Sequence, residues 1–205
     1  MRAVSLLEGR AVVLGRAEVD TDQIIPSVWL KRVERTGFGR GLFSEWRDDP
    51  NFVLNRPEHQ GATILVAGAH FGIGSSREHA VWALLDYGFR AVIAPSFGDI
   101  FRNNASKQGL VVVALGDDDV QSLGSWAAAH PDASLVVDVA RRVVEVASTG
   151  WQRSFDLEEW TRQRLINGWD DIGLTLRHDQ EIERFEAASR VPTVEGLFDA
   201  SGHLL

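Results

Sequence analysis

Short runs of apolar, β-favouring residues alternate with longer amphipathic segments along the first two thirds of the chain. The amphipathic segments predict helices at 76–87 and 97–108. The apolar runs predict buried strands at 11–14, 63–67, 91–94 and 110–114. Because strands that alternate with helices build parallel sheets, the pattern favours an α/β fold.

The pattern changes after a further helix, which is predicted at 117–130. Three short apolar runs follow, separated by an Ala-Arg-Arg turn and a Ser-Thr-Gly break. They lie at 135–139, 143–147 and 151–155. Because polar turns join adjacent antiparallel strands, these runs predict a β-meander in the last third of the chain.

The terminal part of the chain predicts two helices, at 157–166 and 179–189, joined by residues 167–173. Asp156 has the position of an N-cap for the first of them. The tail at 191–205 is expected to be loose. Residues 36–57 are rich in glycine and lack a clear period, which suits a lid or an insertion loop. Without repeats or an obvious linker, a single domain over 1–205 is expected.

Composition fits an ordinary globular protein, because 44% of the 205 residues are hydrophobic and 24% are charged. The formal net charge is 21 − 29 = −8, which argues against nucleic acid or an anionic membrane as a partner. The N-terminus lacks the pattern of a signal peptide. The longest apolar run, 110–115, is far too short to span a bilayer. A cytoplasmic protein is therefore expected.

The chain contains no cysteine. This excludes disulfides, thiolate zinc sites, cysteine nucleophiles and an iron–sulfur cluster that the chain ligates alone. The six histidines show no metal-ligand spacing. We therefore expect no metal ion to be bound by this chain alone.

The densest chemical signal is the run Gly72-Ile73-Gly74-Ser75-Ser76-Arg77-Glu78-His79, which lies between a predicted strand and a predicted helix. Its glycines let the backbone approach a ligand, and the N–H groups of a helix start favour an anion. Ser75 and Glu78 also have the spacing of a capping box, so an ordinary helix start explains the serine equally well. Arg77 favours the anion site, because a cation in the first helical turn opposes the helix dipole and its fork suits a carboxylate.

Other interpretations of this turn are disfavoured. It lacks the third glycine of a dinucleotide fingerprint, the Gly-Lys-Ser/Thr of a P-loop and the glycine of a nucleophile elbow. A serine hydrolase using Ser75 and His79 would lack an orienting acid, so His79 is more simply structural. The segment 20–26, with two carboxylates around a hydroxyl, reads as an Asx turn before Pro26 unless it meets the glycine-rich turn.

Three motifs together resemble the swivelling domain of the aconitase superfamily, in particular the family of bacterial 3-isopropylmalate dehydratase small subunits. They are Asp20-Thr21-Asp22-Gln23-Ile24-Ile25-Pro26, the run 72–79, and Ala94-Pro95-Ser96-Phe97-Gly98-Asp99-Ile100-Phe101. The stretch 167–176, with His178-Asp179, is typical of the small-subunit family. The resemblance covers about 9–189 and implies a swivelling β/β/α domain with a mixed sheet and extra C-terminal helices.

The resemblance also implies a function. It indicates a hydro-lyase that interconverts 2- and 3-isopropylmalate through an alkene in leucine biosynthesis, and that acts only with a large subunit. That partner would carry the [4Fe–4S] cluster, with no cofactor on this chain. Ser75 would be the base, and Ser76, Arg77 and Gly74 would bind the carboxylate of a small dicarboxylate substrate.

Two further groups of residues take roles from the same resemblance. Thr21 and Asp22 would orient charged neighbours from behind the site. Leu30, Arg32 and Val33 are candidates for substrate choice, with Val33 meeting the isopropyl group if the register is right. A hydratase for a citraconate- or methylcitrate-type acid, and a non-catalytic anion-binding module, remain as alternatives.

Overall fold

The structure is a computed structural model that describes residues 1–31 and 36–188. The chain divides into two compact units, Met1–Asp170 and Asp171–Leu205, whereas the sequence predicts one domain. Within the described ranges, no helix is long and apolar enough to cross a membrane.

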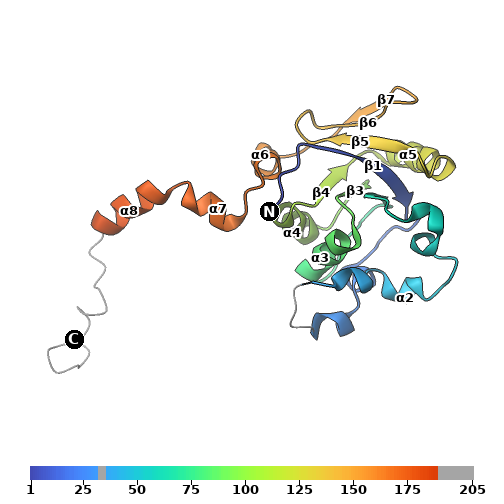
Figure 1. Cartoon of the computed structure of the whole chain (residues 1–205), viewed down its shortest axis with the longest axis horizontal. Helices are drawn as coiled ribbons and strands as arrows, with labels where there is room; N and C mark the ends of the chain where they lie inside the picture. Colours follow the sequence, from blue (N-terminus) through green and yellow to red (C-terminus); the bar gives the residue numbers. More distant parts are fainter. Residues whose placement is uncertain (32–35, 189–205) are drawn as a thin grey trace. The chain divides into compact units, whose positions relative to one another are not determined.

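The first unit is built on one mixed sheet of seven strands, in the order β4-β3-β2-β1-β5-β6-β7 (Figure 1). The strands are β1 (Leu6–Val13), β2 (Ile64–Val66), β3 (Ala91–Ala94), β4 (Val111–Ala114), β5 (Ser134–Asp138), β6 (Val143–Val146) and β7 (Trp151–Ser154). Strands β1 to β4 are parallel, whereas β5 pairs antiparallel with β1 and continues into β6 and β7. The predicted α/β fold, buried parallel strands and antiparallel meander are therefore confirmed.

Helices cover both faces of the sheet. They are α3 (Glu78–Tyr87), α4 (Asp99–Gln108), α5 (Asp117–Ala129) and α6 (Glu159–Asn167), with the short α1 (Thr21–Ile24) and α2 (Ser44–Arg47). Alternate residues of β2 enter opposite cores: Leu65 packs in the cluster that contains α3 and α4 residues, and Ile64 packs with α5. Since both faces are covered, β2 and β3 are buried throughout, which explains their unbroken apolar sequences.

Residues 36–57, predicted to be a lid or an insertion loop, contribute to the core. Their short elements include the 3₁₀ turns η2 (Phe38–Arg40) and η3 (Val53–Asn55). Of the other 3₁₀ turns, η1 (Ser27–Lys31) lies before this segment and η4 (Pro57–His59) begins at its last residue. Phe38, Leu42 and Phe43 are at most 1% exposed and pack in the cluster that contains α3. Buried aromatic side chains hold short turns in this segment. Its hydrophobic residues therefore follow neither the periodicity of a helix nor that of a strand.

The predicted N-cap Asp156 is wrong. Helix α6 begins at Glu159, its N-cap is Glu158, and no side chain caps it. The carboxylate of Glu159 instead accepts hydrogen bonds from Arg162 and Gln163, and these contacts and Arg142 lower its pKa to about 2. An acidic residue inside the first turn therefore stabilises this helix start in place of a cap.

The second unit is described up to residue 188. It contains α7 (Asp171–Leu176) and α8 (Asp179–Ala188), and neither helix holds a buried residue. The sequence treats 167–173 as a connection and therefore misses α7, which is too short to show a period. The predicted loose tail, 191–205, lies outside the described residues.

Asp138 fastens the turn between β5 and β6. Its carboxylate, 8% exposed, accepts hydrogen bonds from the backbone N–H (2.8 Å) and the Nε (2.6 Å) of Arg141. Burial alone would raise the pKa of this carboxyl, but the hydrogen bonds from Arg141, its charge and the Ala140 N–H outweigh burial and lower the pKa. The folded state therefore favours the ionised carboxylate.

We expect Asp138→Asn to lower the free energy of unfolding at neutral pH by about 1–3 kcal/mol, because charge-assisted hydrogen bonds are lost. A lowered pKa in the folded state stabilises it above the unfolded pKa of about 4, and this contribution disappears as pH falls through the folded pKa. Urea unfolding of both proteins at pH 7 and pH 3 measures it. A difference that stays constant or grows at low pH would contradict this role.

Candidate functional site

Three loops meet where parallel strands β1, β2 and β3 end. The middle loop, 67–77, carries the glycine-rich turn and lies between the loop after β1 and the loop after β3. On one side the Gly72 N–H donates to Val19 O (2.7 Å), and on the other the Phe71 N–H donates to Ser96 O (3.0 Å). In open α/β sheets ligands bind at the carboxyl ends of the strands, which makes this junction the candidate site.

Glycine is required both in this turn and in the loop beside it, for different reasons. Gly74 has φ +93, a left-handed conformation that L side chains rarely adopt. Gly98, in the loop after β3, has ordinary dihedral angles, but a Cβ there would lie 2.4 Å from Gly72 O. The loop after β3 can therefore approach the turn only because Gly98 has no side chain.

Gly98→Ala should consequently destabilise the protein by about 1–3 kcal/mol, in the range of overpacked interiors, and displace the turn. Gly116→Ala is a matched control: both glycines are extended N-caps, but the nearest atom to a Cβ at Gly116 is 3.9 Å away. Thermal unfolding of the two variants makes the comparison. Equal melting temperatures would show that the contact with Gly72 does not constrain residue 98.

Ser75 and Ser76 are exposed at the tip of this turn. The capping-box interpretation of Ser75 is wrong, because α3 begins at Glu78 and its N-cap is Arg77. In the described ranges no hydrogen bond involves the hydroxyl of either serine. Both hydroxyl groups therefore remain available to a ligand.

Arg77 lies one position before the first turn of α3, and not within it as the sequence predicts. Its φ of −128 is extended, since the chain is still leaving the glycine-rich turn. The Arg77 guanidinium, 17% exposed, forms an ion pair with the carboxylate of Asp22, which is 54% exposed. The guanidinium is therefore placed to bind a carboxylate, and Asp22 supplies one within the chain.

The segment 20–22 contacts the glycine-rich turn. This contact is the condition under which the sequence analysis gives the segment a functional role. Asp20 caps α1: its carboxylate accepts from Gln23 N (2.7 Å), and its own N–H donates to Gln23 Oε1 (2.9 Å). The cap is thus a full capping box where the sequence predicts an Asx turn. Thr21 is 2% exposed, and its Oγ1 donates to Ser75 O (3.0 Å), while its N–H donates to Ile73 O (2.9 Å).

The structure thus brings together Thr21, Asp22, Gly74, Ser75, Ser76 and Arg77. Of the predicted specificity residues, Leu30 is half-buried in η1 and packs against the core cluster of α3. Arg32 and Val33 lie outside the described residues. His79 contacts two aromatic rings, Phe38 and Trp82, at centroid distances of 5.2 and 4.7 Å, as a structural residue would.

Two residues at this junction were missed by the sequence analysis. His70 has φ +59, although a left-handed conformation costs a non-glycine residue about 1–2 kcal/mol. Its N–H donates to Ser96 Oγ (2.9 Å), and its Nδ1 lies 3.3 Å from the same oxygen. Ser96 belongs to a motif that the sequence analysis noted. The sequence does not show that its hydroxyl binds the backbone of His70, because this contact depends on the positive φ of that histidine.

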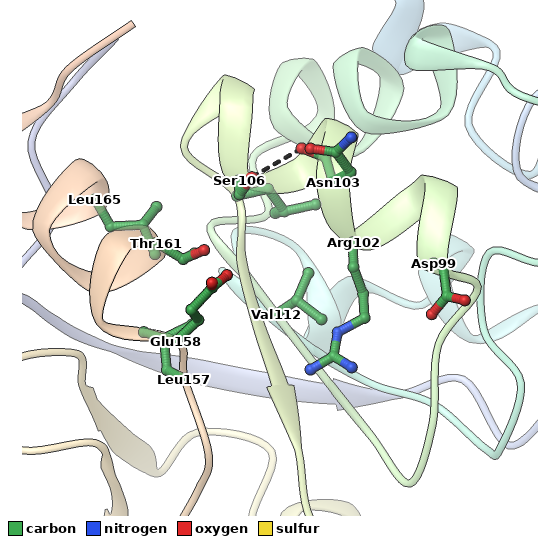
Figure 2. Close-up of a pocket in the computed structure, with 10 residues that line it drawn as sticks. Asp99, Arg102, Asn103, Ser106, Val112, Leu157, Glu158, Thr161 and Leu165 are labelled. Carbon is green, nitrogen blue, oxygen red and sulfur yellow. Dashed lines mark hydrogen bonds between the residues drawn. The ribbon is translucent and has the colours of Figure 1, made fainter. Parts of the chain in front are cut away.

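A separate cleft of about 460 Å³ lies between α4, β4 and α6. Figure 2 shows Arg102 and Asn103 of α4 on one side, Glu158 and Thr161 on the other, and Val112 of β4 between them. None of the predicted site residues lines this cleft. In the part of the chain that the structure describes, no group of three or more His, Cys, Asp or Glu side chains could hold a metal ion.

The mixed sheet holds the glycine-rich turn between two loops at the carboxyl ends of its parallel strands, and the match to a known family identifies this part of the chain as an aconitase-type domain. The family model described as the aconitase C-terminal domain matches residues 1–118. The model for the C-terminal domain of the 3-isopropylmalate dehydratase small subunit matches 171–190, the part that holds α7 and α8. The chain belongs to the 3-isopropylmalate dehydratase small-subunit family.

Known relatives agree with this family. The 3-isopropylmalate dehydratase small subunit of Rubrobacter xylanophilus is 56% identical over 186 residues, covering 91% of this chain and 94% of that protein. The one from Acidothermus cellulolyticus is 61% identical over 179 residues, covering 87% and 90%. A crystal structure of 3-isopropylmalate dehydratase from Methanocaldococcus jannaschii shares the fold, with a TM-score of 0.66 at 24% identity over 87% of this chain and 98% of that one.

Proposed function

We propose that this chain is the small subunit of a 3-isopropylmalate dehydratase, a hydro-lyase that interconverts 2- and 3-isopropylmalate through 2-isopropylmaleate in leucine biosynthesis. The observation that carries the proposal is the identity of 56–61% to small subunits of that name, over nearly the full length of each chain. The shared name implies a large-subunit partner. A cytoplasmic location fits such a biosynthetic enzyme.

Ser75 is the proposed base. The reaction removes a carbon-bound proton, which demands a strong base in a site that stabilises negative charge. A neutral hydroxyl is too weak, so its pKa must be lowered by nearby cationic and N–H groups. The free hydroxyl of Ser75, the start of α3 and the guanidinium of Arg77 support this assignment.

Arg77, Ser76 and Gly74 are the proposed binders of a substrate carboxylate. A guanidinium can hold both oxygens of a planar carboxylate, and Asp22 provides such a carboxylate in the free protein. A substrate carboxylate would compete with Asp22 for the same fork. Thr21 supports the turn from behind by holding the Ser75 carbonyl, so Thr21 and Asp22 act through Ser75 and Arg77.

The family implies a [4Fe–4S] cluster, and this chain does not fit that group, because it has no cysteine. We therefore assign the cluster to the large subunit and derive no step of this chain's chemistry through it. What this chain contributes is a proton acceptor and a carboxylate pocket. Each subunit alone should then hold an incomplete site.

Two alternative functions are not favoured. A citraconate- or methylcitrate-type hydratase would use the same carboxylate pocket, and only residues that meet the alkyl group, such as the candidates Leu30, Arg32 and Val33, would distinguish it. A non-catalytic anion-binding module would need no large subunit. The relatives named as dehydratase subunits support neither alternative.

Sedimentation and a substrate comparison test the proposal. The chain, mixed with a cysteine-bearing aconitase-type large subunit under anaerobic conditions, should sediment as a complex that prefers 2-isopropylmalate to citraconate. Preference for citraconate would favour the related hydratase. Failure to sediment together, with an intact cluster on the large subunit, would contradict the proposed assembly.

A further inference from the structure

Ser96, directly after β3, holds the segment that leads into the glycine-rich turn. Its Oγ accepts the N–H of His70 (2.9 Å), and its carbonyl accepts the N–H of Phe71 (3.0 Å). Gly98 N donates back to Phe71 O (2.9 Å), which completes a short parallel bridge between the two loops. In the described ranges, Ser96 therefore accepts two of the three hydrogen bonds that hold the backbone of residues 70 and 71.

The conformation of His70 depends on this serine. His70 has φ +59, and its exposed side chain is not held by the hydrophobic core. The only side-chain partner of the His70 backbone in the described ranges is Ser96 Oγ, which also lies 3.3 Å from the ring Nδ1. Without that oxygen, His70 loses the side-chain contact that offsets its left-handed strain, and among the described residues only the backbone hydrogen bonds of Ala69 and Phe71 still oppose a relaxation toward negative φ.

Relaxation at His70 would reach Ser75, because the intervening turn is held from the other side as well. Gly72 N is bonded to Val19 O, and Thr21 binds the carbonyls of Ile73 and Ser75. On the preceding side, Ala69 O accepts the N–H of Glu18 (2.7 Å), so a rotation at residue 70 shifts the path of the chain between these anchors. The tip of the turn, with the Ser75 hydroxyl, lies on that path.

We infer that Ser96 is a positioning residue that sets the place of the Ser75 hydroxyl by holding His70 in its left-handed conformation. This inference rests on the proposed function of Ser75 as the base. It assigns Ser96 no contact with the substrate. Its main expected effect is on proton removal, because the Arg77 guanidinium is held separately by Asp22.

The test uses the reconstituted pair of subunits with 2-isopropylmalate and with substrate deuterated at the carbon that loses its proton. For Ser96→Ala we expect kcat to fall about tenfold, because rates depend steeply on the placement of catalytic groups, while KM changes about twofold or less. The kinetic isotope effect on kcat should rise, since proton removal becomes slower relative to the other steps. A loss of folded protein would instead scale kcat and leave the isotope effect unchanged.

A second variant tests the role of strain directly. Glycine adopts φ +59 without a side-chain penalty, so His70→Gly should make the Ser96 hydroxyl dispensable. We expect Ser96→Ala to lower kcat much less in the His70→Gly background than in the wild type. Equal losses in both backgrounds, an unchanged isotope effect, or an unchanged kcat for Ser96→Ala would each overturn the inference.

Two controls separate this inference from the proposed function. If the wild-type pair does not turn over, the proposed function fails. If Ser75→Ala retains activity, the base assignment fails and takes this inference with it. When the wild type is active and Ser75→Ala is not, the Ser96→Ala results judge the positioning role alone.

Discussion

Replacing Ser75 with alanine is expected to lower kcat of the reconstituted pair by about a thousandfold or more, since a general base contributes about 10²–10⁴-fold. The Ser75 hydroxyl is exposed and does not cap α3. Its removal therefore breaks no hydrogen bond within the part of the folded chain that the structure describes. Steady-state turnover of 2-isopropylmalate measures the effect. Melting temperature and association with the large subunit should stay at wild-type values.

Ser125→Ala is a suitable control for this experiment. Ser125 is likewise an exposed serine, but it lies within α5, and its hydroxyl donates to Gln121 O (2.9 Å). We expect this variant to retain wild-type turnover. Activity near the wild-type value in Ser75→Ala would rule out the serine as the base.

Arg77→Lys is expected to reduce kcat/KM by about 10–100-fold, because a lysine keeps the charge but loses the bidentate fork. Most of the effect should appear in KM if the guanidinium binds a carboxylate in the ground state, and in kcat if it also stabilises charge that develops on proton removal. Turnover at varied concentrations of 2-isopropylmalate separates the two parameters.

Arg153→Lys provides a matched control for the arginine. Arg153 on β7 is also ion-paired, with Asp119 at 2.6 Å, but it belongs to the antiparallel part of the sheet. The control should leave kcat/KM unchanged. If Arg77→Lys also leaves it unchanged, Arg77 does not bind the substrate.

The sequence predicts the parallel strands well because burial on both faces leaves a physical signature in the strands themselves. Ile64, Leu65 and Val66 are all at most 2% exposed, so the run is apolar at every position. Helix boundaries are harder to predict from the sequence, because they depend on tertiary contacts. The serines before α3 stay in the turn since Thr21 and Val19 bind the turn's backbone, and α3 starts only at Glu78.

The composition of the candidate site is partly predictable for a similar reason. The glycine-rich turn is recognisable locally, because glycines, serines and an arginine before a helix suit an anion. Its contact with Thr21 and Asp22 joins residues more than 50 positions apart and arises only when β1 and β2 pair. The role of Ser96 is harder still to predict from the sequence. It depends on the positive φ of His70, which no local pattern predicts for a histidine.

The absence of cysteine leads to a sharp test of whether this chain acts with a partner or alone. If the chain supplies a base and a carboxylate pocket while its partner supplies the cluster, the reaction requires both proteins together. The decisive measurement is formation of 2-isopropylmaleate from 2-isopropylmalate by each purified subunit and by the anaerobically reconstituted pair. We predict alkene formation by the pair and none by either protein alone. Turnover by this chain alone, or an inactive pair with an intact cluster, would contradict this division of the active site.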